Sequence, residues 1–116
     1  MTLTDDIVEK YANNGEDNMA ITIKQLIDEF ANGATEGFTG TKSNPGNLLI
    51  KGSQLIHYQT PIAERTEDGW IINLSQYSIQ TGSVQKQIKE RFENVDYCVV
   101  KKVPRNYKGS LKDFQK

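Results

Sequence analysis

Few side chains in this sequence could act as a nucleophile or a general base. The chain has one histidine, His57, and one cysteine, Cys98, among 116 residues. Hydrolysis would require His57 beside a hydroxyl or thiol, with a third group orienting the imidazole ring. The candidates are Ser53, Ser75, Ser78 and Cys98, and no spacing brings any of them to His57. We therefore predict no catalytic residue and a structural histidine on a strand, and keep a small hydrolase as a third alternative.

Metal ions and nucleotide cofactors are not expected either. A zinc site would have to use mainly carboxylates, because histidine and cysteine occur once each. Glu67 and Asp68 are adjacent acids, but they fall in a predicted turn, which explains them without catalysis. The segment GTKSNPG lacks the Lys-Ser/Thr ending of a phosphate-binding loop, and no G-x-G-x-x-G follows a strand. The sequence predicts a non-enzymatic protein with no cofactor and no metal site.

Six hydroxyl, phenol and amide side chains form the candidate binding surface. They occupy a Tyr-Gln-Thr-Pro bend and a Tyr-Ser-Ile-Gln-Thr stretch at the entry to a helix. If exposed, they offer a partner hydrogen bonds and aromatic rings. Alternatively, the rings enter the core and the hydroxyls cap the helix or satisfy turn amides. The predicted partner-binding residues are Tyr58, Gln59, Thr60, Tyr77, Ser78 and Thr81.

Charge is distributed unevenly along the chain, although the net charge is -1. Residues 1–40 carry eight acids against two lysines, whereas residues 100–116 carry six basic residues against one aspartate. A basic segment interleaved with aromatic rings is typical of nucleic-acid binding, although a pI near 5.8 argues against it. The alternative is a solvated tail or a contact with the acidic N-terminal part. The residues of the nucleic-acid hypothesis are Lys101, Lys102, Arg105, Tyr107, Lys108 and Lys112.

Two helices are predicted in the N-terminal part, residues 1–33. Thr4 is a suitable N-cap for a short helix ending near Asn13. Thr22 and Gln25 form a capping box, and four apolar residues follow at helical spacing, Ile23, Leu26, Ile27 and Phe30. The following residues, 34–46, are rich in glycine and polar side chains, so we predict an exposed, mobile loop there.

A β-meander is predicted over residues 47–80. Gly52 and Ser53 separate two apolar runs, which indicates a tight hairpin with positive φ at the glycine. A second hairpin is predicted with Asp68–Gly69 at its centre. Pro61 removes a ladder amide, so we expect a bend at Thr60–Pro61 or an edge strand. Residues 73–80 fit a turn plus a short fifth strand.

The remaining elements are a helix over 83–93 and a strand over 95–103. Ser83, or alternatively Thr81, would cap the helix, in which Val84, Ile88 and Phe92 form one apolar face. The strand is β-branched and contains Cys98, for which we predict a buried thiol. The fold class is thus α+β: an antiparallel sheet of four to five strands, with the helices packed on one face. Residues 1–103 form one domain, followed by a basic tail or strap, 104–116.

No run is apolar enough for a membrane span, and the start MTLTDD lacks the features of a secretory signal. We therefore expect a cytoplasmic protein without a membrane partner.

The pattern GNLLIKGSQLIHYQTPIAER, followed by INLSQYSIQTGSVQKQI, resembles a widespread set of small phage and mobile-element proteins. The match covers residues 26–92. Here Gln80-Thr81-Gly82 replaces what is often a Thr-Thr-Ser/Lys run. The resemblance implies a setting, a phage or integrated element in a bacterial host cell. Small proteins of such origin often inhibit host machinery, including CRISPR and restriction systems.

Three functional hypotheses follow. The first is a non-enzymatic protein that binds a host protein or ribonucleoprotein, in the manner of an anti-defence inhibitor. The second is a nucleic-acid-binding accessory protein that uses the basic C-terminus. The third is the small hydrolase around His57. The oligomeric state stays open, and a homodimer is compatible with the sequence.

Overall fold

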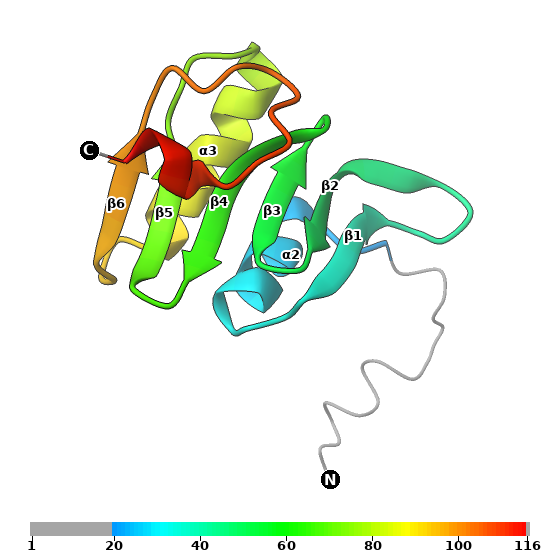
Figure 1. Ribbon diagram of the computed structural model, residues 1–116. Helices are drawn as coiled ribbons and strands as arrows, with labels where there is room; N and C mark the ends of the chain where they lie inside the picture. Colours follow the sequence, from blue (N-terminus) through cyan, green and yellow to red (C-terminus); the bar gives the residue numbers. More distant parts are fainter. Residues whose placement is uncertain (1–19, 116) are drawn as a thin grey trace, which may run out of the picture.

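The computed structural model describes residues 20–115 and shows an α+β fold with a six-stranded sheet. The predicted helix near residues 4–13 lies outside the described residues. Figure 1 shows the sheet with its strands in sequence order, from β1 at one edge to β6 at the other. The strands are β1 (Glu36–Gly40), β2 (Pro45–Lys51), β3 (Gln54–His57), β4 (Thr60–Thr66), β5 (Gly69–Asn73) and β6 (Tyr97–Val100). The helices are α2 (Ile23–Ala31), α3 (Ile79–Arg91) and the short 3-10 helix η2 (Leu111–Phe114).

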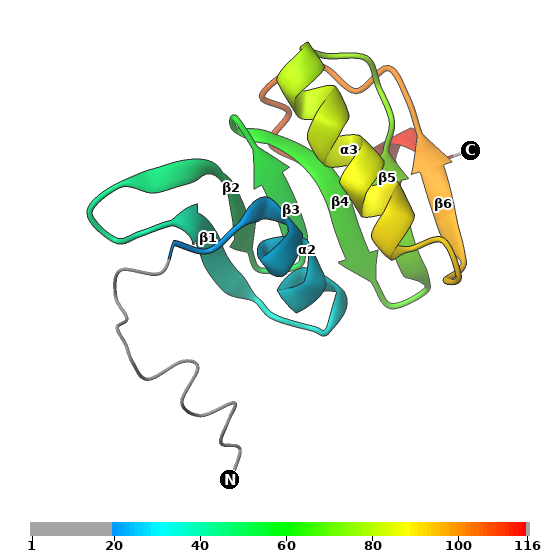
Figure 2. The same cartoon turned by 180° about the vertical axis from the view of Figure 1, so that it is seen from behind.

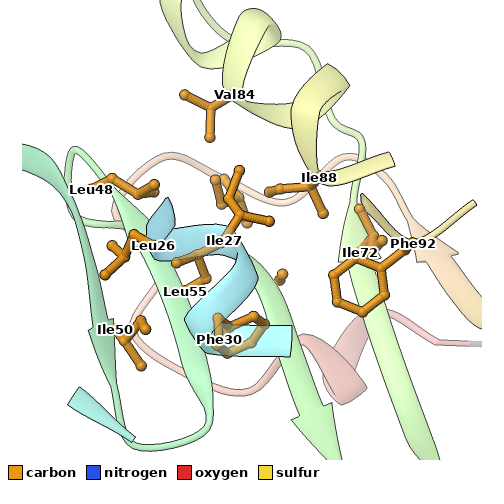
Figure 3. Packing of buried hydrophobic residues seen from close by; sticks show 12 residues of the cluster. Leu26, Ile27, Phe30, Leu48, Ile50, Leu55, Ile72, Val84, Ile88 and Phe92 are labelled. Carbon is orange, nitrogen blue, oxygen red and sulfur yellow. The ribbon is translucent and has the colours of Figure 1, made fainter. Parts of the chain in front are cut away.

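Helices α2 and α3 cover one face of the sheet, as predicted (Figure 2). The predicted capping box of α2 is present, with the Gln25 amide donating to Thr22 Oγ1 and the Thr22 amide to Gln25 Oε1. Apolar side chains from both helices meet those of the sheet between the two layers (Figure 3). Trp70 packs edge-on against Phe30 and Phe92, with ring centroids 5.4 and 4.9 Å apart. This layer is the main core of the domain.

The C-terminal residues cross the opposite face of the sheet as a strap (Figure 1). Leu111 is fully buried against Ile71, Val100 and Val103, which form a second, smaller apolar cluster. Glu64, on β4, accepts hydrogen bonds from the Ser110 hydroxyl and the Leu111 amide, both at 2.7 Å. Of the two alternatives for residues 104–116, tail or strap, the described part therefore has the second form.

The sheet has more strands than predicted, and it is mixed. Residues 34–46 are not simply a loop: β1 and the start of β2 lie there, with Phe38 opposite Leu49. The glycines that suggested a loop instead accommodate an irregular register between Phe38 and Gly40. Strand β6 runs parallel to β5, because α3 connects the two in a crossover, whereas the prediction was antiparallel throughout.

The hairpin at Gly52–Ser53 is confirmed, with φ of +64° at the glycine. The second hairpin is displaced by one residue: its loop is Glu67–Asp68, and Gly69 already belongs to β5. Thr60–Pro61 is neither a bend nor part of an edge strand, since β4 lies between β3 and β5. Pro61 lies within β4 opposite Ile56, where a register shift accommodates its missing amide, and the chain reverses at residues 58–59.

Helix α3 begins earlier than predicted, and β6 is shorter. The cap is Ser78 rather than Ser83 or Thr81, so residues 79–80 are helical and no fifth strand forms over 73–80. Val84, Ile88 and Phe92 are buried as predicted. Residues 101–103 leave the strand. Cys98 is exposed, contrary to the prediction, because β6 is an edge strand.

Candidate functional site

The turn between β3 and β4 lies at the centre of the candidate site. Its two residues, Tyr58 and Gln59, have φ of +50° and +68°. A two-residue hairpin with positive φ at both positions favours Asn-Gly, since other side chains crowd the backbone there. Here a tyrosine and a glutamine occupy both positions. The residues of this turn are therefore not those that its backbone geometry favours.

The Tyr58 side chain is held in place and partly exposed. Its hydroxyl accepts a hydrogen bond from Asn47 Nδ2 at 2.9 Å and donates one to Gln80 Oε1 at 3.0 Å. Its ring packs edge-on against His57. With 47% of its surface exposed, Tyr58 presents a fixed aromatic ring to solvent. The turn is thereby tied to β2 and to the first turn of α3.

His57 lies beneath this turn and faces α3. Its Nδ1 is 3.0 Å from Thr81 Oγ1, and the Ser78 hydroxyl donates to the same Thr81 oxygen at 3.2 Å. Ser78 also caps α3, because its Oγ accepts from the Thr81 amide. Burial lowers the pKa of His57, since the imidazolium loses its hydration there. The ring is therefore neutral near pH 7 and has a structural hydrogen bond.

The strap completes the site. The Tyr77 hydroxyl donates to the Val103 carbonyl at 2.6 Å, and the Asn106 amide donates to Thr60 Oγ1 at 2.9 Å. The Arg105 guanidinium lies 6.0 Å from the centre of the Tyr77 ring. Together the turn, the start of α3 and the strap enclose a cavity of about 140 Å³. Its lining residues are His57, Tyr58, Thr60, Tyr77, Ser78, Thr81, Arg105 and Asn106.

Five of the six predicted partner-binding residues line this cavity, and they come from segments about 20 residues apart. Gln59 belongs to the turn but does not line the cavity. Both alternatives for the cluster are partly realised, because Thr81 is buried and Ser78 is a cap, whereas Tyr58 is exposed. Within the described residues, His57 is hydrogen-bonded to Thr81 and to none of the nucleophiles considered from the sequence.

Most basic residues of the nucleic-acid hypothesis lie on the strap, and Lys101 and Lys102 come just before it. All the lysines among them are exposed, and Arg105 alone reaches the cavity. The Tyr107 ring is partly occupied by contacts within the strap, because it packs against Phe114 and its hydroxyl donates to Asp113. These contacts restrict its stacking on a nucleic-acid base. The Asp113 carboxylate raises the pKa of Tyr107, since it stabilises the protonated phenol.

Sequence reasoning missed three residues that shape the site, namely Asn47, Gln80 and Asn106. The signal for Asn47 was available. Counting outward from the Gly52–Ser53 turn pairs Leu48 with His57, and thus places Asn47 beside Tyr58. Gln80 lies between Ser78 and Thr81, within the Tyr-Ser-Ile-Gln-Thr stretch that the sequence already singles out. Nothing local in the sequence indicates that Asn106 meets Thr60.

Comparison with protein-family models, curated proteins and solved structures finds no match. The resemblance to phage and mobile-element proteins therefore stays a prediction. Over residues 20–115, no group of three or more His, Cys, Asp or Glu side chains is arranged to hold a metal ion. In the same part of the chain, no helix has the length and apolar character needed to cross a membrane.

This cavity is smaller than usual small-molecule sites, which enclose about 300–1,000 Å³, against about 140 Å³ here. A second cavity of about 410 Å³ shares His57 and Tyr58 with it and is also lined by Asn47 and Gln80. What the surface offers is one exposed ring, one guanidinium and several hydroxyls. These groups can bind by hydrogen bonding and aromatic contact, which are the interactions of a macromolecular interface.

Proposed function

We propose that this chain is a non-enzymatic phage or mobile-element protein that binds a host protein or ribonucleoprotein through the site around Tyr58. The observation that carries the proposal is the Tyr58–Gln59 turn. Left-handed backbone costs roughly 1–2 kcal/mol for each ordinary residue, and both turn residues adopt it. Strain of this kind is concentrated at functional sites, where it positions a particular side chain.

The chemistry of the surrounding side chains supports a protein partner. Tyrosine and arginine are enriched among the residues that dominate binding energy at protein interfaces. Tyr58 and Arg105 both border the cavity, which can receive one side chain of the partner. The hydroxyl of Tyr58 is already held by Asn47 and Gln80, so little side-chain entropy is lost on binding.

A turn exchange tests this proposal. Tyr58→Asn combined with Gln59→Gly installs the residues that the turn geometry prefers, which offsets the loss of the Tyr58 contacts, so we expect the protein to stay folded. We expect it to lose the partner that the wild-type chain captures from a bacterial lysate. The matched control is Glu67→Gln with Asp68→Asn, in the turn at the other end of β4, which should retain the partner. Equal capture by the turn-exchanged and control proteins would refute the role of this site.

The anti-defence part of the proposal requires a cellular experiment. Expression in a host with active CRISPR or restriction immunity should restore plaque formation by a targeted phage. The turn-exchanged protein, expressed at the same level, should not restore it. If the wild-type chain leaves plaque counts unchanged in every defended host, the anti-defence proposal is wrong. The binding proposal is tested separately, by the capture experiment.

Nucleic-acid binding is the second candidate, favoured by the exposed basic residues along the strap. Deleting the strap would be a poor test, because Leu111 is part of an apolar cluster. Lys108→Gln with Lys112→Gln removes charge while leaving the strap anchored. Binding to an oligonucleotide should then weaken, and its dependence on salt concentration should become less steep. Wild-type binding that does not respond to salt would exclude this mode.

A further inference from the structure

The two edges of the sheet differ in how they are protected against pairing with another chain. At β1, the register is irregular between Phe38 and Gly40, and Gly40 is bridged to Ile21. At the other edge, β6 pairs with β5 alone among the described strands. Its four residues contain no charge, proline or bulge, so shortness is the one feature it shares with edge strands that prevent pairing. Within residues 20–115, no strand pairs with the outer side of β6, which leaves that side open to another strand (Figures 1 and 2).

The backbone groups that face outward can be identified. The Val100 carbonyl accepts from the Leu74 amide at 2.9 Å, so the backbone of Val100 faces inward. Backbone direction alternates along a strand, so Cys98 also bonds to β5. The amides and carbonyls of Tyr97 and Val99 then point outward. Val99 is 45% exposed, so this edge is apolar, and no other described strand pairs with it.

We propose that a second copy of this chain pairs with β6 in antiparallel fashion, about a two-fold axis at Cys98. A two-fold axis perpendicular to the sheet keeps the helical layers of both copies on one side. Residues directly opposite each other must then lie on the same face of the sheet, so the axis passes midway between the two copies of one residue. Centring on Cys98 places Tyr97 opposite the partner's Val99. These positions carry the outward backbone groups, so each pair exchanges two hydrogen bonds.

The charges that flank β6 favour a second copy in this orientation. Asp96 precedes the strand, and Lys101 and Lys102 follow it, all three exposed. Antiparallel pairing brings Asp96 near the partner's Lys101 and Lys102, twice by symmetry. Parallel pairing would instead place like charges side by side. The strand is thus complementary to itself in one direction only, which gives a closed dimer rather than a filament.

The central cysteine provides the test of register. In the proposed pairing, the two Cys98 residues form a non-hydrogen-bonded pair, in which Cα atoms lie about 4.5 Å apart. This separation falls within the range of about 4.4–6.8 Å that a disulfide requires. Mild oxidation should therefore link the wild-type protein into a covalent dimer on a non-reducing gel. A dimer in solution that oxidation fails to link would overturn the proposed register.

The dimer itself is tested by sedimentation of the full chain under reducing conditions. Val99→Pro removes one outward amide and leaves the bonds to β5, so the dissociation constant should rise about tenfold or more. Val99→Lys, which keeps the backbone intact, should have the same effect. The matched control is Ile79→Lys, at a position that is 92% exposed on α3, and it should leave association unchanged. A monomeric wild-type protein, or a dimer insensitive to both Val99 variants, would overturn the proposal.

Discussion

The buried carboxylate of Glu64 anchors the strap that completes the candidate site. Replacing Glu64 should show how much this carboxylate contributes to the free energy of unfolding. Glu64 is 6% exposed. Its Oε1 accepts from Gln54 Nε2 at 3.1 Å and from the Leu111 amide at 2.7 Å, while Oε2 accepts from the Ser110 hydroxyl. In Glu64→Ala all three bonds are lost, and the buried Leu111 amide has no replacement acceptor. Gln54 keeps a second bond, to the Gly109 carbonyl.

The expected loss follows from these contacts. An unsatisfied buried amide costs about 1–3 kcal/mol, and hydrogen bonds to a charged group contribute about 1.5–3 kcal/mol each. Because Ser110 and Gln54 can rebond to water or to the strap, we expect Glu64→Ala to lower the free energy of unfolding by about 3 kcal/mol. Glu64→Gln retains one acceptor oxygen and should lose only about 1 kcal/mol.

Urea unfolding measures both values, and hydrogen exchange at the Leu111 amide reports the strap locally. Exchange at Leu111 should accelerate more in Glu64→Ala than exchange in α2. Glu67→Gln, in an exposed turn of the same chain, is the matched control and should change stability by less than about 0.5 kcal/mol. An equal loss of unfolding free energy in Glu64→Ala and in this control would contradict the role of Glu64. An equal loss in Glu64→Gln and Glu64→Ala would contradict it too.

Three further predictions concern glycines and pH. Gly82→Ala should raise the free energy of unfolding by about 0.5–1 kcal/mol, because an added Cβ inside α3 meets no atom within 4 Å. Gly46→Ala should lower the free energy of unfolding, because its Cβ would lie 2.2 Å from Thr39 Oγ1. Thermal unfolding of both variants checks this pair. Burial lowers the His57 pKa below its ordinary 6.5, so the unfolded chain binds the proton first, and stability should fall as pH drops below about 6.5. Urea unfolding at two pH values should show a smaller loss of stability for His57→Gln than for the wild-type protein. Asp113→Asn should lower the Tyr107 pKa, measured by phenolate absorbance, and an unchanged value would contradict the hydrogen bond.

The sequence predicted best those features that depend on neighbouring residues. The capping box of α2 and the Gly52–Ser53 hairpin each lie within a few residues, so local chemistry determines them. The start of α3 was missed because its first turn shows no apolar face: Thr81 is the buried residue there, whereas Ile79 is 92% exposed.

Long-range contacts account for what the sequence could not predict. Strand β1 consists of Glu-Gly-Phe-Thr-Gly, and only its pairing with β2 makes it a strand. Cys98 has apolar neighbours in sequence, yet its exposure depends on β6 being the last strand of the sheet. The proximity of Tyr58 and Tyr77 was predicted because both belong to the stretch containing the turn and the helix entry. The contribution of the strap required the fold.

Asn73 explains why these separate segments hold one geometry at the site. Its side chain is fully buried and donates to the Pro61 carbonyl and the Tyr77 hydroxyl, while its Oδ1 accepts from the Ser75 amide. The Tyr77 hydroxyl in turn donates to the strap at Val103. One amide thus joins β4, the segment before α3 and the strap. Because every group in this network has a partner, the loop that carries Tyr77 and Ser78 is held in one geometry, which is what the binding proposed for this site requires.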